Sequence, residues 1–397
     1  MRTWLSTWPR ARDSVSPVQT EVLIIGGGLA GCATAYYLAR AGVEVMVVER
    51  YDLNTQASGC NAGSIHAQIP HEPFMIEGEA WARNFAPTIP IMLESIRLWA
   101  GLEAELGADL EVSLGGGILV AETDAQLRDV ERKVLIERAH GLGVELLSRG
   151  DLRQMAPYVS ERMVGGAYCA TEGKANPLKV TPAFARAALG HGARIETDTV
   201  VTGLAPAAGG YRAETDRGSI TARRVVNSAG AEAGRIAAML GLTLPIEGHP
   251  IQVNVTEPVA SFIGHLIYFA GEKLTLKQAR NGSLLIGGGW PARLSVVGGR
   301  PVVDLDSLRA NLEVAQQVVP AVGAARLLRV WPAIVNGTQD WKPILGEVPG
   351  LPGFFMNMFP WMGFTAGPIS ALVTAELVMG RTPSLDLAQF SALRHVA

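Results

Sequence analysis

The chain has 397 residues, of which 48% are hydrophobic and 18% are charged, and it contains 45 glycines. This length predicts two or three domains, and the composition is typical of a soluble α/β protein with many tight turns rather than a disordered or fibrous chain. The formal net charge of −3 provides no basic field for nucleic acid. The longest apolar runs fall far short of the ~20 residues of a membrane span. We therefore expect neither a nucleic-acid partner nor a transmembrane segment.

The N-terminal residues 1–20 contain three arginines but lack the apolar core of a secretory signal. They are predicted to form a flexible leader or an interface arm, and the protein is expected in the cytoplasm. The cysteines are odd in number and lack the spacing of metal ligands, so we predict neither a disulfide framework nor a metal site. They are Cys32, Cys60 and Cys169.

A β-α-β unit comes next in the chain. Apolar runs predict strands at Val22–Ile25 and Val45–Val48. The pattern between them predicts a helix from about Ala30 to Arg40 that stops at Gly42.

The middle of the chain carries a polar, glycine-rich segment at residues 54–70 and then two helical patterns. The first runs from about Pro87 to Leu106, and the second follows a strand and ends at Ala139. Four short runs separated by glycine-rich turns then predict an antiparallel meander inserted into the parallel sheet. These runs are Arg194–Glu196, Val200–Leu204, Tyr211–Thr215 and Ser219–Ser228.

The remaining segments complete the expected architecture. The pair Asn281-Gly282 between two strand runs predicts a hairpin in a second, antiparallel sheet. Near the C-terminus a strand and a glycine turn precede a helix from about Ala366 to Met379. We infer an α/β chain (α+β overall), in which a Rossmann-like cofactor domain is interrupted by an antiparallel-sheet substrate domain. The cofactor domain is assigned residues 21–85, 145–240 and 325–397, and the substrate domain residues 86–144 and 241–324.

The turn after the first strand carries the pattern G-x-G-x-x-G at the start of a helix, which is the context of a dinucleotide site. The glycines allow a tight turn, a close approach of the backbone to a pyrophosphate, and close packing of helix on strand. The helix N-terminus favours phosphate, and a carboxylate at the end of the second strand suits ribose hydroxyls. Taken alone, the motif fits FAD and NAD equally. The residues assigned to this site are Gly26, Gly28, Leu29, Ala30, Gly31, Glu49 and Arg50.

Several stretches resemble the D-amino acid oxidase (DAO) family of flavoproteins, and the resemblance runs from about residue 21 to 390. They are the opening unit, the loop "ASGCNAGSIH", the strand "TDTVVTGL", the turn "RRVVNSAGAEAG" and the closing "FPWMGFTAGP". The resemblance implies FAD as cofactor, bound non-covalently because no cysteine follows Cys169. N–H groups at the start of the last helix would face the pyrimidine end of the flavin, where they stabilise negative charge. The further cofactor residues that it implies are Ser58, Asn61, Ala62, Gly63, Val200, Ala229, Gly230, Met362, Gly363, Phe364 and Thr365.

The same resemblance implies the reaction. A flavin of this family takes a hydride from the carbon beside an amine, which leaves an imine that water hydrolyses. The chain looks closest to the flavin subunits of opine oxidases, hydrogen cyanide synthases and hydroxyproline dehydrogenases, whose partner subunits carry FAD or an iron–sulfur centre. Three alternatives stay open: an electron-transfer flavin subunit, a single-chain glycine or sarcosine oxidase, and an NAD-linked dehydrogenase.

The substrate is expected to be a small amine or amino acid, with one departure from the family pattern. Where single-chain glycine oxidases place carboxylate-binding arginines, this chain has Val335 and Trp361. A bulkier secondary amine, or a different carboxylate anchor, therefore fits better. The candidate catalytic or substrate-contacting residues are His66, Trp361, Tyr268 and His249.

Overall fold

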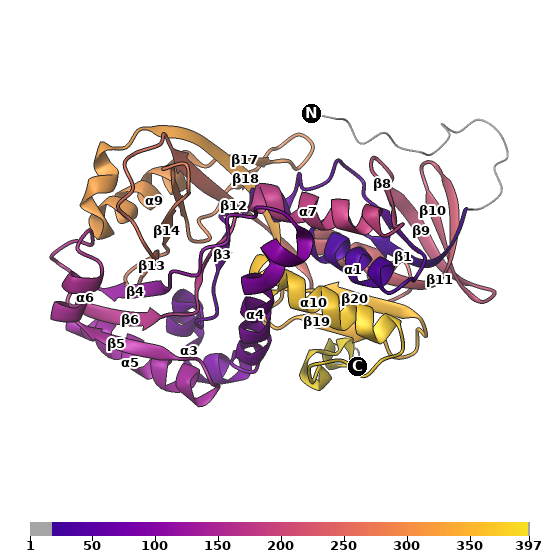
Figure 1. The fold of residues 1–397 in the computed structure, drawn as a ribbon, viewed down its shortest axis with the longest axis horizontal. Coiled ribbons are helices and arrows are strands. Elements are labelled where there is room, and N and C mark those ends of the chain that lie inside the picture. Colours follow the sequence, from indigo (N-terminus) through magenta and orange to yellow (C-terminus); the bar gives the residue numbers. More distant parts are fainter. Residues whose placement is uncertain (1–17, 396–397) are drawn as a thin grey trace.

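A computed structural model describes residues 18–395 of the chain. Two eight-stranded sheets organise the molecule, and Figure 1 shows them side by side with helices over both. The first sheet has the strand order β19-β20-β11-β1-β2-β8, and β10 and β9 extend it by pairing in turn beside β11. Its strands are β1 (Val18–Ile25), β2 (Val45–Val48), β8 (Arg194–Glu196), β9 (Val201–Ala207), β10 (Gly210–Thr215), β11 (Gly218–Asn227), β19 (Ile344–Glu347) and β20 (Phe354–Met358).

Strand β1 is central and is buried on both faces, as parallel strands between helices usually are. Val22 and Ile24 face one apolar core, formed mainly with the helices α1 (Leu29–Arg40), α4 (Thr88–Leu106), α7 (Pro177–Gly190) and α10 (Gly363–Val378). Leu23 and Ile25 face the other core, with the meander and the short helix α8 (Ala233–Ala238). The parallel register of β1 with β2 and β11 aligns the carboxyl ends of these strands at one edge.

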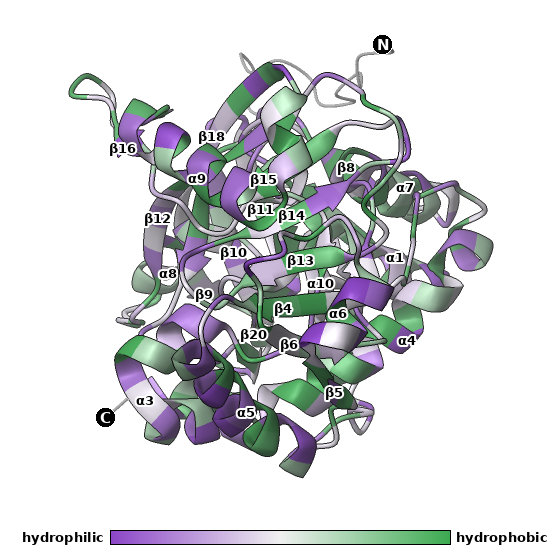
Figure 2. Cartoon of the chain, turned by 90° about the vertical axis from the view of Figure 1, so that its left-hand side faces the viewer, coloured by the Kyte–Doolittle hydropathy of each residue, from purple (hydrophilic) through white to green (hydrophobic). Residues whose placement is uncertain are grey.

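The second sheet has the order β18-β12-β15-β14-β13-β4-β6-β5 and is antiparallel except for the pair β13 and β4. Figure 2 shows β4 and β13 as largely hydrophobic strands, whereas α5 beneath them carries many hydrophilic residues. Its strands are β4 (Gly117–Ala121), β5 (Val144–Ser148), β6 (Gly165–Cys169), β12 (Glu247–Thr256), β13 (Leu266–Phe269), β14 (Thr275–Gln278), β15 (Leu284–Gly287) and β18 (Leu327–Gly337). Four helices accompany this sheet, namely α3 (His71–Phe85), α5 (Asp124–Ala139), α6 (Arg149–Met155) and α9 (Leu305–Val318). The shorter elements are helix α2 (Ala57–Cys60) and two pairs of two-residue strands. These pairs are β3 (Ser64–Ile65) with β7 (Gly173–Lys174), and β16 (Arg293–Leu294) with β17 (Pro301–Val302).

The structure confirms the fold class and most of the expected elements, with several differences of detail. The meander consists of β9, β10 and β11, because β8 pairs in parallel with β2. The hairpin of β14 and β15 has a five-residue loop rather than a two-residue turn, since the strands end at Gln278 and resume at Leu284. Helix α10 starts at Gly363, three residues before the predicted Ala366.

The strands pair across the expected boundaries of the leader and of the two domains. The predicted leader reaches residue 20, but Val18–Ile25 forms β1, while residues 1–17 lie outside the described part. The predicted cofactor segments 145–240 and 325–397 include most of β5 and all of β6 and β18, yet these strands pair in the second sheet. Alternation reveals a strand but not its neighbours, which depend on long-range packing. Within residues 18–395, none of the helices is long and apolar enough to cross a bilayer.

Candidate active site

A groove runs along the carboxyl ends of β1, β2, β11 and β20, where open α/β sheets bind their ligands. Its walls come from segments far apart in the chain, as the colours of α1, β11 and α10 in Figure 1 show. The predicted cofactor residues that line it are Gly26, Gly28, Leu29, Ala30, Glu49, Arg50, Ser58, Asn61, Ala229, Gly230, Gly363 and Phe364.

The three glycines of the turn between β1 and α1 meet three different environments. Gly26 has a φ of +111°, and a Cβ there would lie 2.4 Å from a backbone carbonyl oxygen, that of Ser228. A Cβ at Gly31 would lie 1.9 Å from the carbonyl oxygen of Gly26. A Cβ at Gly28 would meet only the side chain of Ser58, on the groove side. Gly26 and Gly31 therefore close the turn, whereas Gly28 leaves backbone open to a phosphate at the helix N-terminus, and the cradle fits FAD.

Glu49 follows β2 and lines the end of the groove beside the glycine turn. Its carboxylate accepts from the backbone N–H of Gly27 at 2.7 Å and from that of Tyr51 at 2.9 Å. Arg50 forms an ion pair of 3.3 Å with Glu232, in the short 3-10 turn that follows β11. This end of the groove thus offers carboxylate oxygens beside the glycine turn, as the ribose of a dinucleotide requires.

The loop that contains α2 holds itself against the glycine turn. The Ser58 hydroxyl accepts from the Leu29 N–H at 2.9 Å. Asn61 donates through Nδ2 to the carbonyl of Ser58 at 2.7 Å and accepts through Oδ1 from the N–H of Gly63, also at 2.7 Å. Gly63 adopts a φ of +75°, which glycine reaches without strain. The polar side chains of this loop therefore fold it into one conformation along the groove.

The first turn of helix α10 packs against the end of this loop. The buried Thr365 hydroxyl accepts from the His66 N–H at 3.1 Å and donates to the Ser64 carbonyl at 3.2 Å. The Thr365 carbonyl accepts from the Trp99 indole at 2.8 Å. Thr365 therefore fixes the first turn of α10 against the loop and α4. Ala62 and Met362 line a second cavity that adjoins the groove. Gly31, Gly63 and Thr365 line neither the groove nor this cavity.

Val200 lies outside this lining, although its two neighbours Thr199 and Val201 belong to it. Its N–H donates to the Asp216 carboxylate at 2.8 Å, and its carbonyl accepts from the Asp216 N–H at 3.1 Å. The N–H is therefore committed, whereas the carbonyl oxygen keeps a second lone pair for the backbone contact to adenine, which stays a prediction.

A second cavity, of about 460 Å³, adjoins the groove and shares Asn61, Val335, Trp361 and Phe364 with it. It lies between the loop after α2, the start of α3 and the second sheet. Three of the four predicted substrate residues line it, namely His66, Tyr268 and Trp361, whereas His249 does not. No arginine lines it within residues 18–395, and its two lysines each pair with a carboxylate.

His66 and Tyr268 stack at the inner wall of this cavity, with ring centroids 6.4 Å apart. Burial and the nearby Lys277 lower the pKa of His66 to about 4, so its imidazole is neutral at physiological pH. Tyr268 donates to the Glu172 carboxylate at 3.1 Å. Burial, followed by the charge of Glu172, raises the pKa of Tyr268 well above its usual value. Both side chains therefore remain uncharged near neutral pH.

Two stacked tryptophans lie where the second cavity meets the groove, and one of them, Trp361, lines both. Trp361 stacks on Trp341 at 4.8 Å between ring centroids, and its ring also packs against His249 at 4.5 Å. Both tryptophans have a positive φ, +56° and +58°, a strained conformation that is concentrated at functional sites. A Cβ at Gly337 would lie within 2.8 Å of both His249 and Trp361, so this packing requires glycine there. His249 thus contacts the wall from behind and supports Trp361.

Buried charges around the second cavity escaped the sequence analysis. Lys133 forms a fully buried ion pair with Glu137, and Lys277 is fully buried with Ser64 as a hydrogen-bond partner at 2.7 Å. Burial and the charge of Lys174 lower the pKa of Lys277 to about 7. In the sequence these residues look like charges on amphipathic elements. The only signal in the sequence was the presence of polar residues in the strand β14, and the structure buries three consecutive residues of this strand.

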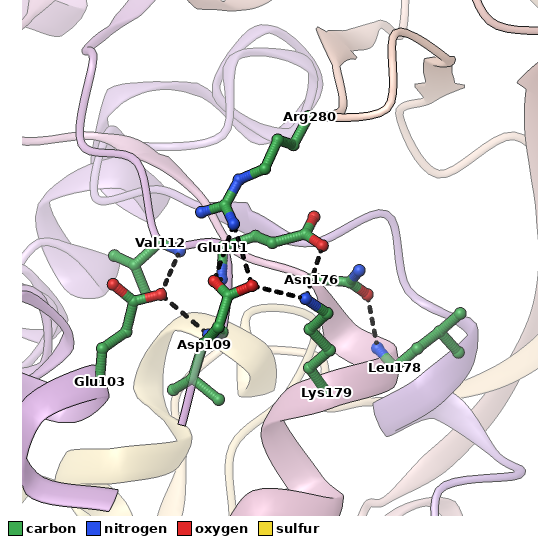
Figure 3. A network of polar contacts seen from close by, with 9 residues as sticks. Glu103, Asp109, Glu111, Val112, Asn176, Leu178, Lys179 and Arg280 are labelled. Carbon is green, nitrogen blue, oxygen red and sulfur yellow. Dashed lines mark hydrogen bonds and ion pairs between the residues drawn. The ribbon is translucent and has the colours of Figure 1, made fainter. Parts of the chain in front are cut away.

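A third cavity, of about 550 Å³, lies on the far side of the loop and is lined by Lys174, Lys277, Arg280, Arg329 and Trp331. An ion cluster at its rim joins the segment after α4, the helix α7 and the loop between β14 and β15 (Figure 3). There Asp109 accepts from Arg280 and Lys179, each at 2.9 Å, and Lys179 also pairs with Glu111. The hydrogen bond from Lys179 is the main reason that the pKa of Asp109 falls to about 2. Residues 18–395 contain no group of three or more His, Cys, Asp or Glu that could hold a metal.

The chain is similar to known proteins in its family model, its sequence and its fold. The family model described as FAD dependent oxidoreductase (DAO) matches residues 21–377. The beta chain of the sarcosine oxidase of Rhizobium meliloti (strain 1021), named as a subunit, is 28% identical, over 98% of this chain and 91% of that protein. A subunit of the opine oxidase of Agrobacterium tumefaciens (strain Ach5) is 27% identical, over 95% of this chain and 98% of that protein. The crystal structure of glycine oxidase from Geobacillus kaustophilus has a TM-score of 0.83 and 26% identity, and the match covers 96% of this chain and 100% of that one.

Proposed function

Because the chain belongs to the DAO family of FAD-dependent oxidoreductases, we propose that it oxidises the C–N bond of a secondary amine or an amino acid. The family match includes every segment that lines the groove, and it sets aside the NAD-linked alternative because the cofactor of this family is FAD. The observation that carries the proposal is the junction of the two cavities at Asn61, Val335, Trp361 and Phe364. A substrate in the second cavity would meet the flavin at this junction.

The residues of the chain have three tasks in this reaction. The glycine turn and the start of α1 hold the phosphates, and the start of α10 supplies N–H groups at the flavin end. When bound, the flavin supplies the hydride acceptor. Apolar and aromatic walls exclude water from the second cavity and hold the substrate carbon against the junction. His66 lines this cavity as a neutral side chain, because burial and the charge of Lys277 lower its pKa to about 4 and disfavour its protonated form.

The lining of the second cavity supports a substrate larger than glycine. Its volume of about 460 Å³ lies within the usual range of ligand pockets. An arginine clamp for a carboxylate would have to come from the lining, yet the lining residues in the described chain include none. We propose an opine, an imino acid or another bulky secondary amine, held by neutral donors and aromatic walls. A single-chain oxidase of glycine or sarcosine type is the alternative.

Two of the relatives described above are named as subunits, which supports a proposal that this chain works with a partner subunit. Such a partner would carry FAD or an iron–sulfur centre and would take electrons from the flavin. Substrate bleaching distinguishes this catalytic role from that of a pure electron-transfer subunit. A catalytic chain is bleached by its substrate without the partner, and an electron-transfer chain is not.

The proposal is tested by anaerobic titration of the purified yellow protein. The panel consists of opines, D-amino acids, sarcosine, proline and hydroxyproline, and the readout is the loss of flavin absorbance. We expect at least one secondary amine to reduce the flavin fully. If no amine in the panel bleaches the protein, whereas dithionite does, amine oxidation by this chain alone is refuted.

A further inference from the structure

The hydroxyl group of Tyr268 in the second cavity is committed to a carboxylate. Tyr268 donates to Glu172 Oε2 at 3.1 Å, and Glu172 is fully buried. A tyrosine hydroxyl has a single proton and two acceptor lone pairs. Because that proton is used by Glu172, the oxygen of Tyr268 has only its lone pairs to offer to a molecule in the cavity.

Glu172 is held in this acceptor role by three further donors. Its Oε1 accepts from the backbone N–H groups of Ala67 and Gln68 at 2.7 and 2.8 Å, and its Oε2 accepts from Gln68 Nε2 at 3.0 Å. A Cβ at Gly117 would lie 2.0 Å from Oε2, so β4 makes room for the carboxylate only with glycine. Burial raises the pKa of Glu172, while these hydrogen bonds and the charge of Lys133 oppose the rise. Two donors on each oxygen occupy the lone pairs that a proton would need.

We propose that Glu172 is a positioning residue that makes Tyr268 a hydrogen-bond acceptor toward the substrate, and that the substrate therefore carries an N–H on the nitrogen of the oxidised C–N bond. This inference rests on the proposed oxidation of an amine. It selects primary and secondary amines, including cyclic ones, over tertiary amines and ethers.

The acceptor role fits the chemistry of hydride loss. As the C–H bond breaks and its electron pair leaves with the hydride, the nitrogen lone pair forms the C=N bond of the imine. An N–H held by Tyr268 orients the nitrogen without using this lone pair. A donor at the same place would instead bind the lone pair and oppose its conjugation. Hydride loss from a neutral amine that carries an N–H leaves an iminium ion, whose N–H stays directed at the Tyr268 oxygen until water hydrolyses the C=N bond.

The test compares isosteric amines and ethers that differ in N–H against O. The pairs are sarcosine with methoxyacetate, and proline with tetrahydrofuran-2-carboxylate. The holoenzyme is titrated anaerobically, and dissociation constants are read from the perturbation of the flavin spectrum or from the concentration dependence of reduction. We expect the wild type to bind at least one amine about tenfold or more tightly than its ether, the cost of facing an acceptor with an acceptor.

Two variants then move this preference in different ways. In Glu172→Gln the new amide donates to the tyrosine oxygen and turns the Tyr268 proton toward the cavity. The ether should bind about tenfold more tightly and the amine less tightly. Tyr268→Phe removes both possibilities, so the ratio within each pair should approach one, which tests the inference even if the first variant fails to fold. The exposed Glu145→Gln serves as a matched control and should leave the ratios unchanged.

The outcomes separate this inference from the proposed function. A wild type that binds neither amine more tightly than its ether overturns the inference, as does a preference that both variants leave unaltered. If amines reduce the flavin in all variants with unchanged ratios, amine oxidation stands and the role of Glu172 falls. If amines bind preferentially but never reduce the flavin, the acceptor geometry stands and amine oxidation falls.

Discussion

At the scale of single residues, the buried Lys277 should make the free energy of unfolding depend on pH. It is fully buried, and burial with the neighbouring Lys174 lowers its pKa from 10.5 to about 7. Between these two values the unfolded chain binds a proton that the folded chain does not. The free energy of unfolding therefore rises with pH through this window, and each pKa unit contributes about 1.4 kcal/mol.

Replacing the buried amine should remove this dependence. We expect Lys277→Met to flatten the rise of the free energy of unfolding between pH 7 and pH 10, measured by urea denaturation at several pH values. Lys273→Met is the matched control, because Lys273 pairs with Glu72 at the surface of the same segment and should leave the slope intact. A slope that persists in Lys277→Met would show that another group titrates.

Gly28 offers a second prediction at this scale. Because an added Cβ would lie 2.9 Å from the Ser58 hydroxyl oxygen and would meet no backbone atom, Gly28→Ala should fold after a small shift of the Ser58 side chain. It should bind FAD about tenfold more weakly, the effect of overpacking by roughly 1–3 kcal/mol. Equilibrium dialysis against FAD measures the loss. In Gly234→Ala the Cβ would make ordinary contacts outside the groove, and this control should retain full affinity.

At the scale of elements, the start of α10 depends on the contacts of Thr365. Thr365→Val removes the hydrogen bonds to His66 and Ser64 and leaves the part-buried His66 N–H and Ser64 carbonyl without this partner. We expect a loss of about 1–3 kcal/mol in the free energy of unfolding, together with weaker FAD binding.

The same helix supplies the control. The hydroxyl of Thr374 is buried, and no hydrogen-bond partner for it is found in the described part of the chain. Thr374→Val should therefore be neutral or stabilising by the same urea measurement. Equal losses in the two variants would mean that α10 responds to valine itself rather than to its contact with the loop.

Elements were also the level at which sequence reasoning succeeded best. The apolar runs and the glycine turn of the opening unit predicted β1, α1 and β2 closely, because local periodicity and turn chemistry determine them. The buried contacts of Glu172, Lys133 and Lys277 could not be predicted, since charged residues are usually exposed. The use of both backbone groups of Val200 by Asp216 depends on a register that no local pattern encodes.

At the scale of the whole molecule, FAD should act as a structural element. The groove joins α1, the turn after β11 and the start of α10, so a cofactor bound in it would contact segments far apart in the chain. A ligand that binds only the folded state stabilises it by about 2.7 kcal/mol at a hundredfold excess over its dissociation constant.

We therefore expect the melting temperature of the stripped protein to rise with the logarithm of the FAD concentration and to keep rising above the dissociation constant. Circular dichroism at 222 nm follows the transition, and riboflavin, which lacks the ADP half, should give a smaller shift. All of the yellow colour should appear in the supernatant after acid precipitation, because the cofactor is proposed to be held without a covalent bond. Colour retained in the pellet would refute this part of the proposal.

The strands of the first sheet come from distant parts of the chain, which affects when the groove can form during synthesis. Strand β1 pairs with β11, which emerges from the ribosome about two hundred residues later, and β20 and α10 emerge later still. Domains usually fold during synthesis from the N-terminus onward. Here the glycine turn is translated well before α10, and its groove is completed only after α10 has been synthesised. Cells short of riboflavin should therefore accumulate full-length, uncoloured chains for proteases to remove, whereas ribosomes stalled upstream of α10 should yield fragments that never turn yellow.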